Sequence, residues 1–180
     1  MHKHFLITGR PGVGKTTLIK RIVAEIRSTL PNHNINGFYT NEVRQDGFRI
    51  GFDIHTIDGR QGILARSKVP QFKSKLRVGK YFVNLTDLDN LVVPLLYIST
   101  DLLIIDELGK MELFSSKFQK AVNFAFNNQS RILATLPYYK HPFLASIRKR
   151  QDIKIFELTH LNQGSIFDYI VQKLHESSKK

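Results

Sequence analysis

Eight consecutive residues near the N-terminus have the types and spacing of a loop that binds phosphate. They are Gly9, Arg10, Pro11, Gly12, Val13, Gly14, Lys15 and Thr16. Glycines let the backbone curl so that successive N–H groups point at phosphate oxygens, at the positive end of a following helix. In this pattern Lys15 bridges the β- and γ-phosphates, Thr16 offers its hydroxyl to Mg²⁺, and Thr17 contacts the α-phosphate.

The residues on either side of this loop predict the elements that such a loop needs. Residues 5–8 form an apolar run that stops at Gly9, as a buried strand of a parallel sheet does. Apolar residues then recur at helical spacing over residues 16–30, until Pro31 ends the helix. A strand, a loop and a helix therefore follow one another in the required order.

A second group of chemically competent residues lies about 90 positions downstream. The apolar run of residues 102–105 ends in Asp106 and Glu107, which is the form of a Walker B strand. We expect Asp106 to anchor Mg²⁺, and Glu107 to orient or deprotonate a water for attack on the γ-phosphorus. The alternative for Glu107 is a surface acid at a strand end. A hydrolase needs such a carboxylate, whereas a kinase would position an acceptor hydroxyl.

The rest of the chain predicts an α/β domain. Within residues 37–65, apolar and polar residues alternate and two Asp-Gly pairs supply turns, which indicates antiparallel hairpins inserted on the core sheet. Thr86 is placed to cap a helix that starts near Asp87 and is kinked by Pro94. Strands are expected at residues 81–85, 101–106, 132–135 and 153–158, and helices at 118–126, 142–150 and 165–174. This alternation favours a mainly parallel sheet in a single domain over residues 1–176, with a loose tail at 177–180.

Composition limits the classes of protein that fit. The chain has 180 residues, 27 of them basic and 15 acidic, for a net charge of +12, which favours anionic partners. The lack of cysteine excludes disulfides, thiolate zinc sites and cysteine nucleophiles. The longest aliphatic run is far shorter than the roughly 20 residues of a membrane span, and no secretory signal opens the chain. We therefore expect a cytoplasmic monomer with no membrane partner.

The spacing between the two motifs favours one branch of phosphate-loop proteins. The residues between Lys15 and Asp106 leave room for an additional strand between their two strands, as in RecA-like proteins, where the catalytic Glu follows the Walker B Asp. Thr135, at the end of the next apolar strand, would then lie beside Asp106 and could sense the γ-phosphate or hold the water. The alternative is a threonine chosen for its strand propensity.

Over most of its length the chain resembles the cancer-related nucleoside-triphosphatase family of small RecA-like P-loop proteins. The resemblance rests on segments that read GRPGVGKTTLI (9–19), GFYTNEVR (37–44), FRIGFDI (48–54), RVGKYFVNL (77–85) and IIDELGKMELFS (104–115). It implies a three-layer RecA-like fold and Mg²⁺-dependent hydrolysis of ATP, GTP, CTP and UTP with broad base tolerance. The chain departs from the family at residues 159–163, which lack the Asn-Arg pair that the family tends to show there.

The same resemblance brings Lys110 and Glu112 to the site or its edge. Lys110 would neutralise developing phosphate charge, or both residues would only lock the loop after the Walker B strand. Arg77 is the candidate for an intrinsic arginine finger, because it closes a basic stretch and precedes a flexible Val-Gly pair; the alternative is a solvated side chain. Phe38 and Tyr39 would stack on a base or belong to the core.

Two other functions fit part of the sequence. A nucleotide or nucleoside kinase would use the basic stretch as a lid over an acceptor, although the Asp-Glu ending of the Walker B strand weighs against it. This stretch comprises Arg60, Arg66, Lys68, Lys73, Lys75, Arg77 and Lys80. A nucleic-acid-linked ATPase switch would use the net charge for backbone contacts, although no nucleic-acid-binding motif is present.

Overall fold

The strands of the chain join edge to edge in one mixed sheet. The computed structural model describes residues 2–68, 72, 74–128 and 131–177. Within these residues the strands are β1 (His4–Thr8), β2 (Ile35–Gln45), β3 (Phe48–Thr56), β4 (Gln61–Arg66), β5 (Arg77–Val78), β6 (Tyr81–Val83), β7 (Leu102–Asp106), β8 (Arg131–Leu136) and β9 (Ile153–Glu157). They lie in the order β5-β6-β4-β3-β2-β7-β8-β1-β9.

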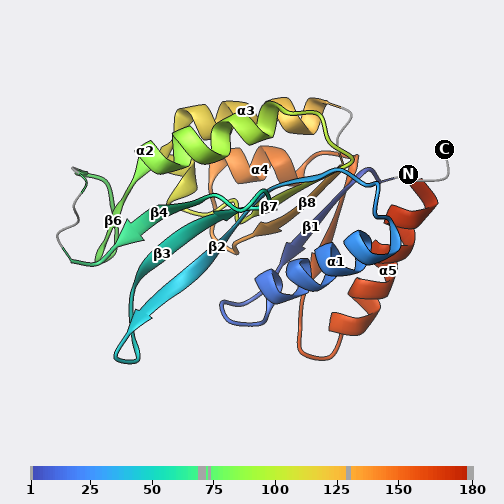
Figure 1. The fold of residues 1–180 in the computed structure, drawn as a ribbon, viewed down its shortest axis with the longest axis horizontal. Helices are drawn as coiled ribbons and strands as arrows, with labels where there is room; N and C mark the ends of the chain where they lie inside the picture. The colour runs from blue at the N-terminus through green and yellow to red at the C-terminus, as the bar shows by residue number, and fades with distance from the viewer. Residues whose placement is uncertain (1, 69–71, 73, 129–130, 178–180) are drawn as a thin grey trace.

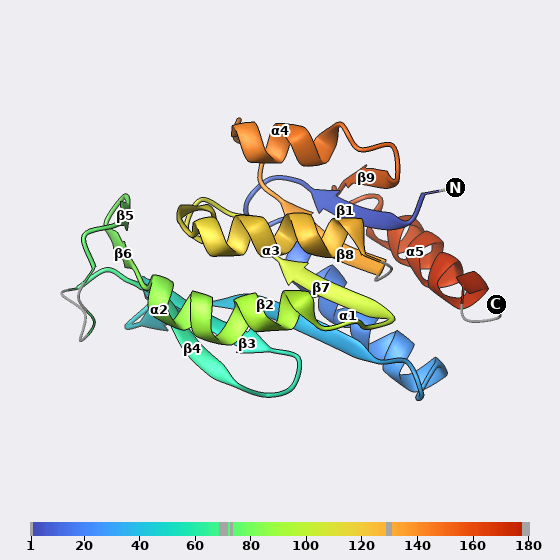
Figure 2. The same ribbon diagram turned by 90° about the horizontal axis from the view of Figure 1, so that it is seen from above.

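Helices cover both faces of this sheet, in three layers (Figures 1 and 2). They are α1 (Lys15–Thr29), α2 (Leu85–Asp87), the π-helical turn η1 (Leu88–Val92), the 3₁₀ segments η2 (Val93–Tyr97) and η3 (Glu112–Phe114), α3 (Ser116–Asn127), α4 (Pro142–Arg148) and α5 (Gln163–Ser177). The layer of α2, α3 and α4 lies above the sheet in Figure 1, and α1 and α5 lie below it. Each layer encloses its own apolar core.

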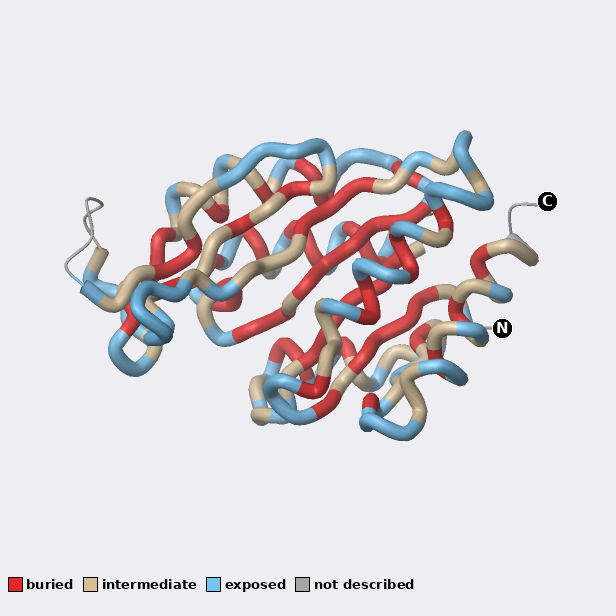
Figure 3. Tube along the Cα trace, turned by 60° about the horizontal axis from the view of Figure 1, so that its bottom comes forward, coloured by how far each residue is buried: buried red, intermediate tan, exposed pale blue. Residues whose placement is uncertain are grey.

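One half of the sheet is parallel and holds the predicted chemistry. Strands β2, β7, β8, β1 and β9 run parallel to one another, so their carboxyl ends meet at one edge. The additional strand predicted between the phosphate-loop strand and the Walker B strand is β8, which pairs with both. The apolar residues of β1, β7 and β8 are buried from both faces, as the red strands of Figure 3 show, which fits strands covered by helices on both sides.

The other half is antiparallel and corrects the expectation of a mainly parallel sheet. Strands β2, β3, β4, β6 and β5 pair antiparallel, so the sheet is mixed. The predicted Asp-Gly turn between β2 and β3 is present, with Asp46 at φ 49° and Gly47 at φ 79°. These strands continue the core sheet edge to edge because β2 pairs with both β3 and β7.

The segment after β6 begins with a different cap from the predicted one. Asn84, and not Thr86, caps α2, because its side chain accepts hydrogen bonds from the N–H groups of Thr86 and Asp87. The helix begins at Leu85, where the sequence predicted the end of a strand. Pro94 lies at the start of η2, where the helical path changes from π to 3₁₀, consistent with a residue that has no N–H to donate.

The predicted tail overlaps the last helix, since α5 runs to Ser177. Residues 178–180 of that tail, and Lys73 of the basic stretch, lie outside the described residues. Within the residues that the structure describes, no helix is long and apolar enough to cross a membrane.

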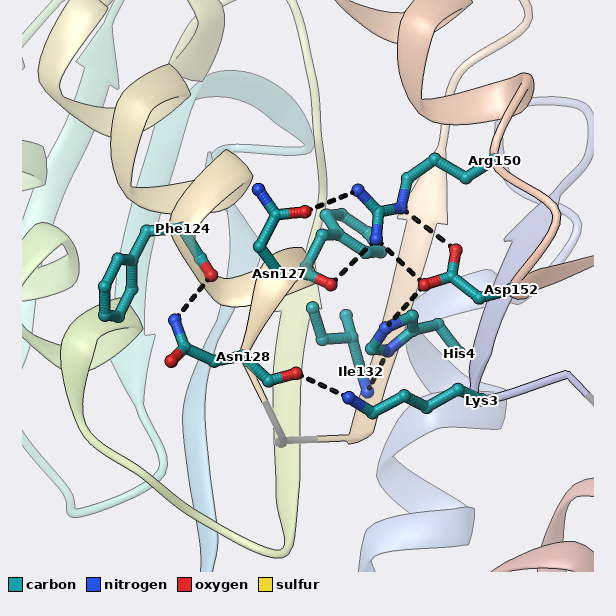
Figure 4. Close-up of polar contacts among 9 residues, drawn as sticks. Lys3, His4, Phe124, Asn127, Asn128, Ile132, Arg150 and Asp152 are labelled. Atoms are coloured by element: carbon teal, nitrogen blue, oxygen red, sulfur yellow. Dashed lines mark hydrogen bonds and ion pairs between the residues drawn. The ribbon is translucent and has the colours of Figure 1, made fainter.

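His4 ties the start of β1 to neighbouring segments at the edge opposite the phosphate loop (Figure 4). Its ring is fully buried. Its Nδ1 accepts a hydrogen bond from the N–H of Ile132 (3.2 Å), and its Nε2 lies 3.6 Å from Asp152 Oδ2. Arg150 in turn contacts both Asp152 and the end of α3. Burial lowers the pKa of His4 from 6.5 to about 4, so the ring is neutral at neutral pH.

Acidification should therefore destabilise the fold through His4. Because its folded-state pKa lies below the unfolded-state value, the stability it contributes is complete above pH 6.5 and is lost as pH falls toward 4. The loss amounts to about 3 kcal/mol. Urea unfolding across this pH window should show a steeper fall for the native chain than for His4→Gln, whose side chain does not titrate. Equal slopes in the two proteins would contradict this role of His4.

Candidate active site

The phosphate-binding loop lies at the carboxyl edge of the parallel strands, between β1 and α1. Gly12 and Gly14 have φ angles of 78° and 100°, in the left-handed region that favours glycine. Gly14 caps α1 through its backbone, since its carbonyl accepts the first helical hydrogen bond, from Leu18 (2.9 Å). The first N–H groups of α1 thus have no partner within the helix and face the mouth of the loop. This is a site for an anion.

Lys15 holds its ammonium over this loop. Its Nζ donates hydrogen bonds to the carbonyls of Gly9 (3.1 Å) and Arg10 (3.4 Å). The predicted residues Pro11, Val13 and Thr17 complete the turn and the first helical turn. A residue that the sequence did not reveal also supports the loop: Gln163, the first residue of α5, donates its side-chain N–H to the carbonyl of Val13 (3.2 Å). No local pattern links residues 150 positions apart.

Asp106 ends β7 next to the start of α1. Its side chain is 2% exposed and accepts a hydrogen bond from the hydroxyl of Thr135 (2.5 Å). Burial raises the pKa of Asp106, against the opposing effects of the Thr135 and Thr16 hydroxyls and of Lys15. Among the described residues, Oδ2 of Asp106 has no hydrogen-bond partner. Since a buried carboxylate oxygen without a partner is costly, this atom fits a hydrated cation beside Thr16.

Thr135 is therefore placed where the sequence predicted, beside the Walker B strand. Ala134 pairs with Ile105, and this register brings Thr135 alongside Asp106. The hydroxyl of Thr135 is fully buried and donates to Asp106. This contact gives Thr135 a role in orienting the carboxyl of Asp106; sensing the γ-phosphate stays a prediction.

Glu107 and Glu112 form a carboxyl pair around Gly109. A Cβ added to Gly109 would stand 2.5 Å from Glu112 Oε2 and 3.0 Å from Glu107 Oε1, so both side chains close on the same glycine. Glu112 is 3% exposed, and burial followed by the nearby Glu107 carboxylate raises its pKa to about 8. Burial also raises the pKa of Glu107, while Lys15 opposes that shift. A carboxylate with a raised pKa is a better base.

The contact with Gly109 predicts a large effect of a single methyl group. Gly109→Ala should displace one or both carboxyls, because a Cβ essentially never stands 2.5 Å from an oxygen. We expect kcat for nucleotide hydrolysis to fall about 10-fold or more, since misplacing a catalytic group by about 1 Å has effects of this size. Gly164→Ala is the matched control, because its Cβ would meet nothing within 4 Å. Equal rates in the two variants would show that the packing around Gly109 is irrelevant to catalysis.

Lys110 and Tyr139 lie against each other at the edge of this pair. The ammonium of Lys110 lies 4.9 Å from the centre of the Tyr139 ring. The hydroxyl of Tyr139 is buried without a hydrogen-bond partner among the described residues, and burial followed by Glu112 raises its pKa. This geometry supports the role of Lys110 in fixing the loop after β7. A contact between Lys110 and phosphate stays a prediction.

The structure does not bring Arg77 or Phe38 to the phosphate loop, whereas Tyr39 lies in register with Asp106. Arg77 lies on β5 at the far end of the sheet, separated from β7 by four strands, and its guanidinium lies 4.3 Å from the centre of the Phe82 ring. Phe38 is fully buried against Phe118, so it belongs to the core and does not stack on a base. Tyr39 is half-buried on the neighbouring strand, in register with Asp106, and contacts Lys20.

An exposed aromatic residue lies two positions after β8. Tyr138 is 50% exposed and donates a hydrogen bond to Glu157 (2.6 Å), at the end of β9. That hydrogen bond raises the pKa of Tyr138, and the charge of Arg10 opposes the shift. No pattern in the sequence singles out Tyr138, since the segment after β8 matches no motif.

The glycine-rich anion site follows β1, Asp106 and Glu107 lie at the end of β7, and β8 pairs between these two strands. This arrangement defines a P-loop NTPase-like α/β protein. The chain belongs to the NTPase family, whose model matches residues 4–171. It is 48% identical over 172 residues to the nucleoside-triphosphatase THEP1 of Thermotoga sp. (strain RQ2), covering 94% of each chain. The resemblance of the sequence to this family is thus confirmed.

Solved structures support the same assignment. The crystal structure of THEP1 from Aquifex aeolicus matches with a TM-score of 0.82 at 37% identity, covering 95% of this chain and 98% of that one. The solution structure of a human cancer-related nucleoside triphosphatase matches with a TM-score of 0.83 at 39% identity, covering 97% and 98%.

Proposed function

We propose that this chain hydrolyses nucleoside triphosphates to the diphosphate and inorganic phosphate, in a reaction that depends on Mg²⁺. The observation that carries the proposal is the proximity of the two motifs. The hydroxyl of Thr16 and the ammonium of Lys15 lie close enough to the buried carboxyl of Asp106 to lower its pKa, and Lys15 acts in the same way on Glu107. The relatives named as nucleoside-triphosphatases support it.

The roles of the residues follow from their positions. The N–H groups of the loop and the ammonium of Lys15 hold the phosphate chain. Thr16 and Asp106 are the residues that would hold Mg²⁺, which supplies positive charge to the β- and γ-phosphates when bound. Glu107 orients a water and accepts its proton as the water oxygen bonds to the γ-phosphorus. The bond from the γ-phosphorus to the bridging oxygen breaks, and that oxygen leaves with the diphosphate.

Broad base tolerance is part of the proposal. Strong selection among bases requires buried polar groups that read the edge of one base. The described residues near the end of β9 include Tyr138, which is 50% exposed and contacts Glu157, and Leu161, which is 98% exposed. The ring of Tyr138 offers a surface for stacking and Leu161 an apolar one, and neither reads the edge of a base, so they accept ATP, GTP, CTP and UTP alike.

A phosphate-release assay with each of the four triphosphates, with Mg²⁺ and with a chelator in its place, tests the proposal. We expect release from all four with Mg²⁺, at rates within about 10-fold of one another, because stacking discriminates weakly. Release should fall to background with the chelator. Release from one triphosphate only, or undiminished release with the chelator, would contradict base tolerance or metal dependence respectively.

A further inference from the structure

The antiparallel half of the sheet has one face that the described helices leave open. The face toward α2 and η1 is core, with Phe38, Ile54, Leu64 and Val83 buried. On the opposite side, Figures 1 and 3 show α1 and α5 beneath the parallel half and no described helix beneath β3 and β4. We call this side of β2, β3, β4, β6 and β5 the open face.

Rings and cations share the open face. Strand pairing places Tyr39 opposite His55, Arg66 opposite Phe82, and Phe82 opposite Arg77, so these side chains point the same way. The Tyr39 and His55 rings are stacked, 5.7 Å apart at 6°. At one end, Lys20 of α1 lies 4.3 Å from the Tyr39 ring, and at the other end Arg77 lies over Phe82. None of the three rings is in the buried core.

The charge of the open face is positive. Between its two ends Arg66 donates to Asp53 (2.6 Å), so that acid is neutralised within the face. Lys20 contacts the Tyr39 ring and donates a hydrogen bond to the Asn41 side chain (2.9 Å), and Arg77 contacts the Phe82 ring. Neither cation forms an ion pair with a carboxylate among the described residues. The net charge of the whole chain is +12. An anionic partner is the one that complements this face.

A cavity at the Tyr39 end extends the open face. It has a volume of about 210 Å³ and lies between α1 and β2, with Lys20, Arg27 and Tyr39 on its walls and Val23 and Ile57 as its apolar lining. A flat ring wall with two cations beside it suits a stacked base with a phosphate next to it.

We infer that the open face binds single-stranded nucleic acid. Its aromatic rings offer stacking sites, which accept any base, and its cations meet the backbone. The four spacings of about 4.8 Å between these five strands add up to about 19 Å, a length that suits a polymer better than a single nucleotide. Because Tyr39 is in register with Asp106, one end of the bound nucleic acid would lie beside Asp106 and Glu107 of the proposed active site.

Fluorescence anisotropy with labelled oligo(U) and oligo(dT) of about 12 nucleotides tests this inference. We expect binding at about 50 mM salt that weakens steeply by about 200 mM, as phosphate contacts require. A duplex of the same length should bind less tightly, because its bases are not free to stack. A duplex that binds as well as the single strands, or no binding at low salt, would overturn the inference.

Matched variants separate the open face from the general positive charge. Phe82→Ala should weaken binding about 10-fold, whereas Phe124→Ala, an exposed ring on α3 in the opposite layer, should have no effect. Arg77→Glu should weaken binding and lower the salt dependence, whereas Lys120→Glu makes the same change of charge on α3 and should do neither. Equal losses within each pair would overturn the inference.

Light scattering completes the test by measuring the mass of the free protein. We expect a monomer at the concentrations of the binding assay. A stable dimer that forms in the native chain but not in Phe82→Ala, together with no oligonucleotide binding, would assign the face to a second copy of the chain and overturn the inference.

Discussion

Glu107→Gln should lower kcat for nucleotide hydrolysis about 10²-fold or more, because general-base assistance contributes on this scale. The amide keeps the size of the side chain next to Gly109 but accepts no proton at neutral pH. Burial raises the pKa of Glu107, which makes its carboxylate a better base than an exposed one. Phosphate release under saturating substrate measures the effect.

The same variant should bind nucleotide as tightly as the native chain. The groups that hold phosphate belong to the loop and to Lys15, which this substitution leaves in place. Titration with a nonhydrolysable analogue should give Kd values within about 3-fold of each other, as expected for a group that acts on the transition state alone. Equal kcat in the two proteins would show that Glu107 takes no part in catalysis.

Asp106→Asn should separate activity from stability. Asparagine can still accept the hydrogen bond from Thr135, but it lacks the charge that we assign to Mg²⁺. The Mg²⁺ concentration for half-maximal hydrolysis should rise about 10-fold to 100-fold, the range for residues that orient a bound metal. The same substitution should maintain or raise Tm, because burial disfavours the charged form of Asp106.

Both the Mg²⁺ requirement and Tm are measured, because misfolding would also lower activity. Thr135→Val supplies the control, since it removes the hydroxyl that contacts Asp106 and leaves the charge of Asp106 in place. We expect a smaller rise in the Mg²⁺ requirement and a lower Tm, because the carboxyl loses a hydrogen bond. An unchanged Mg²⁺ requirement in Asp106→Asn would remove Asp106 from the metal site.

The parts of the site that the sequence could predict are the local ones. The loop of residues 9–16 works through backbone N–H groups at a helix start, so glycine spacing and a following helical pattern suffice to find it. Asp106 and Glu107 follow a run of apolar residues that only a buried strand explains. The contact between Asp106 and Thr135 could also be predicted, because both residues lie at the ends of predicted parallel strands.

The features that could not be predicted from the sequence depend on the order of the strands in the sheet. Arg77 closes a basic stretch in the sequence, but β5 pairs with β6 at the far edge of the sheet, and nothing local fixes that position. The antiparallel hairpins were predicted, but their edge-to-edge continuation of the core sheet was not, because the hairpin pattern does not say that β2 also pairs with β7. Asn84 and Thr86 are both good caps, and only the exact start of α2 distinguishes them.

The fate of the γ-phosphate tests the central claim most directly. Native protein is incubated with a γ-labelled triphosphate in water enriched in heavy oxygen, with a second nucleoside or nucleotide present as a possible acceptor. We predict that the label appears as inorganic phosphate carrying one oxygen from the solvent, and that the acceptor stays unlabelled. Label on the acceptor, with no inorganic phosphate formed, would show a phosphotransferase and contradict the assignment of water as the nucleophile beside Glu107.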